Sequence, residues 1–183
     1  MIKNYYINED LISDLKIDEN TELNFYTKNS DLKININVES GVKLVCHIIS
    51  LLTQPVNYEI NINHDHDSES DIRLKIITKE NGKLNAIIND AVDSHIKGVV
   101  INQQSKILAV NQVKSMVKPN LLINSIDAMA SHGVSIGNIN SDSLYYLMTK
   151  GLTREQARIK LIQGFILGPV YDKETYDFFV KEI

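Results

Sequence analysis

The chain has 183 residues, of which 43% are hydrophobic and 23% charged, and its formal net charge is −4. These totals are typical of one folded domain with a small appendage, and the length allows a sizeable buried core. A net negative charge without a basic stripe argues against a dedicated nucleic-acid-binding protein. The first residues lack the apolar run of a signal peptide, and no segment approaches a membrane span. Since there is also only one cysteine, we expect a cytoplasmic protein without internal disulfides.

Strand-like alternation dominates the first two thirds of the chain. Residues 1–20 form a polar lead-in, for which we predict an edge strand or a short helix and no function. From residue 21 to residue 138, apolar and polar residues alternate, most clearly in the runs Leu32–Val38, Val56–Asn63, Ile72–Ile76 and Leu84–Ile88. A period of two places one face of a strand in a core and the other in water. We therefore predict an all-β domain over residues 21–138.

The turns between these runs leave the strand arrangement open. Asn81-Gly82 has the composition of a tight hairpin turn, which favours antiparallel pairing at that point. Many short strands without intervening helices fit the stacked coils of a β-helix as well as a sandwich of two sheets.

Residues 139–183 have a helical pattern. Asn140 is suited to cap a first helix that ends at Gly151, and Thr153 and Gln156 have the spacing of a capping box for a second helix. Gly168-Pro169 would end the second helix, and a third would start at Asp172. The expected apolar stripes are Leu144, Leu147 and Met148, then Ala157, Leu161 and Phe165, and finally Tyr176, Phe179, Val180 and Ile183.

A specific motif order runs from residue 118 to residue 166. It comprises Lys118-Pro119-Asn120-Leu121-Leu122-Ile123, Ala130-Ser131-His132-Gly133, Gly137, Leu144-Tyr145-Tyr146-Leu147, Lys150-Gly151-Leu152 and Glu155-Gln156-Ala157. Its residues and spacing resemble the C-terminal signature of the SufB/SufD family, the scaffold proteins of the SUF iron–sulfur cluster assembly machinery. The Ser-His-Gly motif is closer to SufD than to SufB. A weaker β-rich similarity extends back to about residue 56.

The resemblance implies a right-handed parallel β-helix with a small C-terminal α-helical subdomain, acting as a scaffold and not as an enzyme. It also implies a homodimer, or a heterodimer with a SufB-type subunit, paired through the β-helices. The helices would dock a SufC-type ATPase, and we expect Tyr145, Tyr146, Lys150, Gly151 and Arg154 at that contact. The chain has no GxxxxGK(S/T) loop, so ATP would be bound by the partner and not by a site of its own.

His132 is the first candidate metal ligand. The resemblance implies that this histidine binds a transient iron–sulfur cluster, or helps to form it, at the subunit interface. His132 continues the alternation of Ile126, Ala128 and Ala130, so we expect its ring to lean toward the interior at the end of a strand. The alternative is a structural histidine that bonds to the backbone of a turn.

Cys46 is the second candidate ligand, because thiolates are the preferred ligands of iron–sulfur clusters. It lies in an apolar run, however, where a lone cysteine is usually a small buried hydrophobe, and the neighbouring His47 should point to the opposite face. One cysteine does not hold a cluster unaided, so further ligands would come from a second subunit, a partner or a small thiol. His64 and His66 would share a strand face suited to zinc or iron, unless their acidic surroundings form a solvated turn.

Three departures separate the chain from the family pattern. The family's proteins are much longer, Ala130 replaces the cysteine that often stands two residues before the histidine, and Gln104-Ser105-Lys106 stands near the place of an Asn-Arg motif. An alternative function is therefore a degenerate structural or binding module of the same fold without a cluster role. A third is a β-helix carbohydrate-active enzyme that uses Asp90 and Asp93 as an acid pair.

Overall fold

The computed structural model describes residues 1–110, 112–167 and 173–180. These residues form eleven strands and three helices. The strands are β1 (Ile2–Ile7), β2 (Leu11–Ile17), β3 (Thr21–Lys28), β4 (Leu32–Val38), β5 (Lys43–Leu52), β6 (Pro55–His64), β7 (Glu69–Thr78), β8 (Lys83–Val92), β9 (Val99–Ala109), β10 (Met116–Ile123) and β11 (Ala128–Gly137). The helices are α1 (Ser141–Thr149), α2 (Arg154–Leu167) and α3 (Lys173–Val180).

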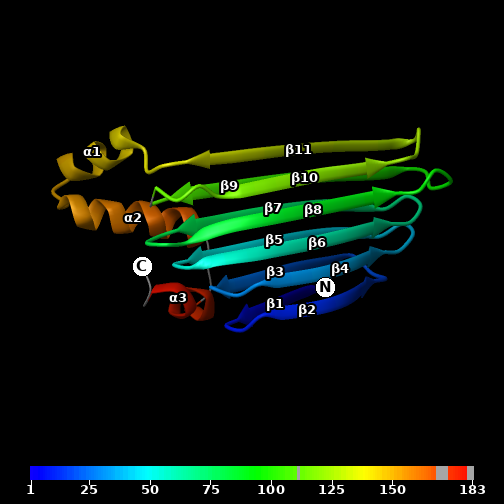
Figure 1. Cartoon of the computed structure of the whole chain (residues 1–183), viewed down its shortest axis with the longest axis horizontal. Coiled ribbons are helices and arrows are strands. Elements are labelled where there is room, and N and C mark those ends of the chain that lie inside the picture. Colours follow the sequence, from blue (N-terminus) through cyan, green and yellow to red (C-terminus); the bar gives the residue numbers. More distant parts are fainter. Residues whose placement is uncertain (111, 168–172, 181–183) are drawn as a thin grey trace.

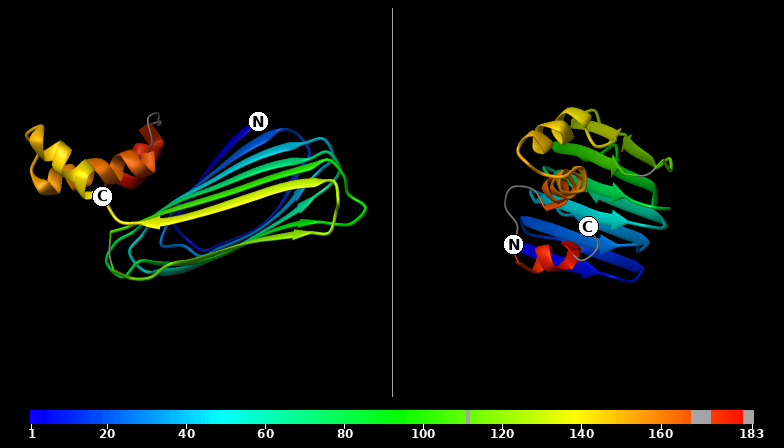
Figure 2. Two further views of the ribbon diagram at one scale, coloured as in Figure 1. Left: turned by 90° about the horizontal axis from the view of Figure 1, so that it is seen from above. Right: turned by 90° about the vertical axis from the view of Figure 1, so that its left-hand side faces the viewer.

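Successive strands alternate between two sheets. The odd-numbered strands form one sheet in the order β1-β3-β5-β7-β9-β11, and the even-numbered strands form the other in the order β10-β8-β6-β4-β2. Neighbouring strands pair in parallel in both sheets. Each coil therefore adds one strand to each sheet and stacks on the coil before it (Figures 1 and 2). The expected parallel β-helix with a small helical part at its C-terminal end is confirmed.

The core lies between the two sheets and is built from ladders of matching side chains. Ile34, Ile60 and Ile88 are successive register partners in β4, β6 and β8, and all three are fully buried. Most other inward positions of β3 to β9 are buried in the same way, because the strand register places inward residues of successive coils on top of one another. Residues 1–20 belong to this stack, since they supply β1 and β2, which pair with β3 and β4.

The tight hairpin that the composition of Asn81-Gly82 favours does not form. This turn joins β7 to β8, which lie in different sheets. A type I′ hairpin needs positive φ at both central residues, but the positive φ in this turn belongs to Glu80, at 51°. The turn stacks on the previous coil instead: the amide of Lys79 donates to the carbonyl of Leu52 at 2.8 Å, and a Cβ on Gly82 would lie 2.1 Å from that oxygen. Glycine is therefore required here for close packing of adjacent coils.

The predicted helix caps are confirmed. The Asn140 side chain accepts hydrogen bonds from the amides of Asp142 and Ser143 at 2.8 and 3.1 Å. At the start of α2, the Thr153 amide donates to Gln156 Oε1 at 2.9 Å, and the Gln156 amide donates to Thr153 Oγ1 at 3.2 Å. The predicted helix stop at Gly168-Pro169, the start at Asp172 and the contact of Ile183 lie outside the described residues.

The helices attach to one end of the strands through a second apolar cluster (Figure 1). Here α2 and α3 pack on the last residues of β3, β5 and β7, and the buried members are Tyr26, Leu51, Ile77, Ile162, Ile166, Leu167 and Phe179. The stripe of α2 thus differs from the predicted one: Ala157 is buried, but Leu161 and Phe165 are only half-buried. The buried face of α2 is shifted by about one residue from the predicted face, because α2 packs against both the strand ends and α3. None of the helices in the described part of the chain is long and apolar enough to span a membrane.

Candidate functional site at the open end of the β-helix

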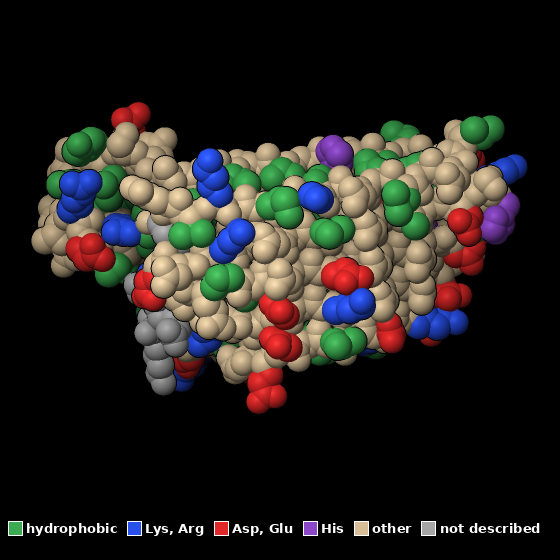
Figure 3. Space-filling model, viewed as in Figure 1, with side chains coloured by type: hydrophobic (Ala, Val, Ile, Leu, Met, Phe, Trp, Pro, Cys, Tyr) green, Lys and Arg blue, Asp and Glu red, His purple; other side chains and the backbone are tan. Residues whose placement is uncertain are grey.

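The β-helix has an uncovered last coil, formed by β10 and β11. β10 pairs with β8 and β11 pairs with β9, and no further described strand covers their other edges. Inward-facing residues of this coil are consequently exposed or half-buried, although their partners one coil below are buried. Hydrophobic side chains gather along this edge of the molecule (Figure 3). We call this surface the open end.

His132 lies on the open end. Its register partner is Gln103, which is 1% exposed and points inward, so His132 occupies an inward-facing position as predicted, but in the middle of β11 and not at the end of a strand. His132 is nevertheless exposed, because it belongs to the last coil. Its ring makes no hydrogen bond to the described residues in this structure, and His132 lies in a strand and not in a turn.

A buried polar network lies beneath this coil. Asp90 Oδ1 is 3.0 Å from His64 Nε2, and the amide nitrogen of Gln103 donates to Asp90 Oδ2. His64 Nδ1 is 3.1 Å from Ser68 Oγ, and Ser70 Oγ is 3.3 Å from His64 Nε2. The side chains of His64 and Asp90 are fully buried.

The proton count of this network follows from its contacts. Ser68 Oγ donates its only proton to the Asp65 carbonyl at 2.7 Å, so it accepts from His64 Nδ1. One further proton lies between His64 Nε2 and Asp90. The pair is therefore neutral overall whichever atom carries that proton, which avoids an uncompensated buried charge.

Gln103 was missed as a site residue, and Asp90 was considered only as half of an acid pair with Asp93. The sequence does contain a sign of Gln103: in the alternation of β9, polar Gln103 and Ser105 occupy inward positions between the apolar residues Val99, Ile101 and Ile107. A buried polar residue at an inward position needs a polar partner, and Asp90 is the only carboxylate at an inward position of the neighbouring β8.

Cys46 is fully buried in the core, so the alternative of a small buried hydrophobe is the one that the structure favours. Burial raises the pKa of the Cys46 thiol to about 12. Cys46, Ile72, Gln103 and His132 are successive register partners, so three strand spacings of about 4.8 Å separate Cys46 from His132, or about 14 Å. The structure does not bring the two candidate ligands together.

The other predicted groups are also apart. His64 ends β6 inside the core, while His66 lies in the following turn, where its Nδ1 accepts from the Lys97 amide at 3.2 Å. Among the described residues, no three His, Cys, Asp or Glu side chains form a metal-binding group. Asp90 is buried and Asp93 is exposed, so they do not form the acid pair of a carbohydrate-active enzyme.

The residues predicted to contact a partner lie on the exposed end of the helices. Tyr145 and Tyr146 are 62% and 61% exposed, and the Lys150 ammonium lies 5.3 Å from the centre of the Tyr146 ring. Gly151 ends α1 with φ of +91°, and the exposed Arg154 starts α2. The five residues therefore share one corner of the molecule.

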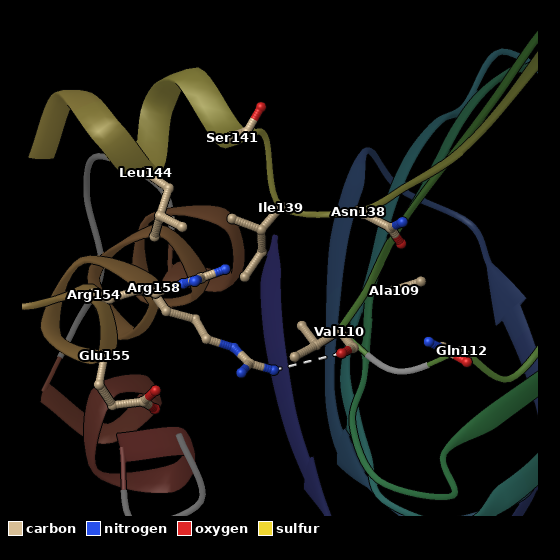
Figure 4. Close-up of a pocket in the computed structure, with 10 residues that line it drawn as sticks. All are labelled: Ala109, Val110, Gln112, Asn138, Ile139, Ser141, Leu144, Arg154, Glu155 and Arg158. Carbon is tan, nitrogen blue, oxygen red and sulfur yellow. Dashed lines mark hydrogen bonds between the residues drawn. The ribbon is translucent and has the colours of Figure 1, made fainter. Parts of the chain in front are cut away.

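A cavity of about 560 Å³ separates this corner from the ends of β9 and β11 (Figure 4). Ile139 and Leu144 contribute apolar lining, Arg154 and Arg158 contribute positive charge, and Glu155 contributes negative charge. The Arg158 guanidinium donates to the Val110 carbonyl at 3.4 Å, which connects α2 to the β-helix.

An uncovered strand edge and exposed aromatic side chains on a helix are features of proteins that work through contacts with partners. The family model described as "SUF system FeS cluster assembly, SufBD core domain" matches residues 19–165. The chain belongs to this SufB/SufD family of iron–sulfur cluster assembly proteins.

Individual relatives agree with this assignment. The iron–sulfur cluster assembly protein SufD of Bacillus subtilis is 36% identical over 82 residues, which are 44% of this chain and 18% of the relative. An iron–sulfur cluster assembly SufBD family protein of Archaeoglobus fulgidus is 31% identical over 107 residues, 55% of this chain and 27% of the relative. The chloroplastic protein ABCI7 of Arabidopsis thaliana is 41% identical over 49 residues, 27% of this chain and 10% of the relative. The matched regions thus span less than a third of each relative.

Proposed function

We propose that the chain is a SufD-like scaffold of iron–sulfur cluster assembly, which pairs through the open end and docks a SufC-type ATPase through its helices. The observation that carries this proposal is the exposure of His132 on an uncovered coil, at an inward-facing position. An imidazole at this position would contact a partner subunit that binds to the last coil, and an imidazole nitrogen is a suitable ligand for iron.

The open end supports pairing with a second scaffold subunit. Backbone groups at the outer edges of β10 and β11 are available to a further strand, and apolar side chains flank them. Val134 and Ile136 are 42% and 48% exposed at inward positions, and Leu122 and Met129 are 52% and 74% exposed at outward positions. A second copy of this chain, or a SufB-type subunit, would bury these side chains.

The helical corner supports docking of the ATPase. Tyrosine and arginine are the residue types that most often dominate the binding energy of an interface, and Tyr145, Tyr146 and Arg154 are exposed together. Because α2 and α3 share an apolar cluster with β3, β5 and β7, a pull on the helices would move the β-helix with them. ATP-driven closure of the partner would in this way change the pairing at the open end.

His132 supplies one ligand to the cluster in this proposal, and the partner subunit or a small thiol supplies the others. Cys46 does not take part, since its thiol is fully buried and its pKa is raised to about 12. A paired subunit would also cover His132, so the movement driven by ATP would be needed to open the histidine to iron and sulfide.

Three measurements test the proposal. Light scattering should show a dimer, alone or with a SufB-type subunit, that gains ATPase subunits when a SufC-type protein is added. Arg154→Glu should weaken ATPase binding by about tenfold or more, whereas Lys97→Glu, in the turn at the far end of the strands, should not. His132→Ala should reduce cluster assembly, measured by visible absorption after anaerobic reconstitution, while His95→Ala should leave it unchanged. A chain that ignores the ATPase and assembles clusters equally well without His132 would contradict the proposal.

A further inference from the structure

Gln103 carries an unused hydrogen-bond acceptor directly below His132. Its side chain is 1% exposed, and its Oε1 is buried without a hydrogen-bond partner among the described residues. Buried polar atoms are nearly always paired, because an unpaired one has lost its water without gaining a replacement. The acceptor therefore needs an explanation.

The orientation of the Gln103 amide is fixed from below. Its Nε2 donates to Asp90 Oδ2, and this contact identifies the amide atom that faces Asp90, because a carboxylate accepts and an amide nitrogen donates. The other oxygen of Asp90 is bonded to His64, so the anchor of the amide is itself held in place. Gln103 cannot turn Oε1 toward Asp90 without losing its own donor contact.

His132 is the polar residue on the strand directly above this acceptor. Gln103 and His132 are register partners, so their side chains leave the sheet on the same side from strands about 4.8 Å apart. Among the described strands, β11 alone lies on that side of β9. The structure shows no hydrogen bond between the two side chains, so the contact requires the His132 ring to turn toward Oε1 about its side-chain bonds.

We infer that Gln103 is a positioning residue for His132: its Oε1 accepts a hydrogen bond from one ring nitrogen and directs the other nitrogen out of the open end. A histidine that binds a metal usually donates its second ring N–H to a fixed acceptor, which sets the tautomer and the ring orientation. The buried series His64, Asp90, Gln103 would provide that acceptor. This inference rests on the proposed function for its purpose, but the hydrogen bond itself is independent of any cluster.

Nuclear magnetic resonance of the metal-free chain tests the contact. With ¹⁵N-labelled histidine, His132 should show one dominant tautomer at a pH where it is neutral, in contrast to the exposed His95. Gln103→Met keeps the length of the side chain but removes the acceptor, and should return His132 to a mixture of tautomers. Gln104→Met, at the neighbouring exposed position of β9, is the matched control and should change nothing. A tautomer mixture in the unsubstituted chain, or no change in Gln103→Met, would overturn the inference.

A measurement without substitution covers the case in which Gln103→Met fails to fold. Magnetisation transfer between the His132 ring protons and the Gln103 side-chain protons should be seen in the unsubstituted chain, and its absence would overturn the contact.

Titration with Co²⁺ separates this inference from the proposed function. Broadening of the His132 ring signals reports binding, which should be about tenfold weaker or more in Gln103→Met. If Co²⁺ never reaches His132 while the tautomer is fixed by Gln103, the contact stands and the ligand role of His132 fails. If Co²⁺ binds equally well in Gln103→Met, positioning by Gln103 is wrong while the ligand role of His132 survives.

Discussion

The buried pair of Asp90 and His64 allows a quantitative prediction about stability. Asp90→Ala should lower the free energy of unfolding by about 3–5 kcal/mol, the usual cost of removing one partner from a buried pair. The contacts give a similar magnitude. The substitution leaves His64 Nε2 without its Asp90 partner and the Gln103 amide nitrogen without its acceptor, and each buried polar atom that loses its partner costs about 1–3 kcal/mol.

Urea denaturation with linear extrapolation is a suitable assay. For a slope of about 2 kcal/mol per molar urea, the midpoint should fall by about 2 M. Asp93→Ala is the control, because this exposed carboxylate lies three positions along the chain, and its removal should change stability by less than about 0.5 kcal/mol.

A multiple variant separates polar satisfaction from simple loss of volume. Replacing the three residues together by apolar ones of similar size (His64→Leu, Asp90→Leu and Gln103→Met) removes both the donors and the acceptors. Such replacements of buried ionic groups are often neutral or stabilising, so the triple variant should be more stable than Asp90→Ala alone. A cost below about 1 kcal/mol for Asp90→Ala, or a triple variant less stable than the single one, would refute a closed network.

Three further results are expected. Because burial raises the pKa of Cys46 to about 12, iodoacetamide at pH 8 should modify this thiol in urea but not in the folded chain, and native labelling seen by mass spectrometry would contradict its burial. The pKa of Cys46 is higher in the folded state than its ordinary value of 9.0, so the protonated thiol contributes fully to stability below pH 9, and this contribution is lost as the pH rises toward 12. The free energy of unfolding of Cys46→Ala, measured by urea titration, should therefore fall less steeply at alkaline pH than that of the unsubstituted chain. Asn140→Ala removes the cap of α1 at a cost of about 1 kcal/mol, so hydrogen exchange in α1 should quicken about fivefold, whereas Asn138→Ala should have no such effect.

Local features of the fold were predictable because they depend on neighbouring residues. Period-two alternation predicts which side chains of a strand are buried, and Leu32, Ile34, Ile36 and Val38 are indeed all buried. Asn140 and the pair Thr153–Gln156 cap helices within three residues of themselves, so no distant contact decides the outcome.

Partner strands were harder to predict, since alternation gives the face of a strand but not its neighbour. Gly82 shows the difficulty: a glycine needed for the approach of Leu52 in the coil below has the same sequence signature as a hairpin glycine. The resemblance to the SufB/SufD family supplied the parallel arrangement that the periodicity alone left open.

The candidate site depended on still more distant relations. His132 was found through its motif, but its exposure follows from β11 being at the edge of its sheet. The contact of Gln103 with Asp90 joins neighbouring coils, and no local pattern pairs those two residues.

The position of the polar groups in the stack explains why the proposed chemistry would belong to the last coils. Along the column that leads to His132, Ile72 lies between Cys46 and Gln103 and is fully buried, so it separates the thiol from the polar network. A histidine at the same inward position two coils lower would be enclosed by coils on both sides, as Ile72 is. Only an end coil lets a side chain be oriented by a packed interior below and meet a ligand or partner above. If Gln103 positions His132 as inferred, the lower coils contribute by holding the layer that carries Gln103 and Asp90 in place.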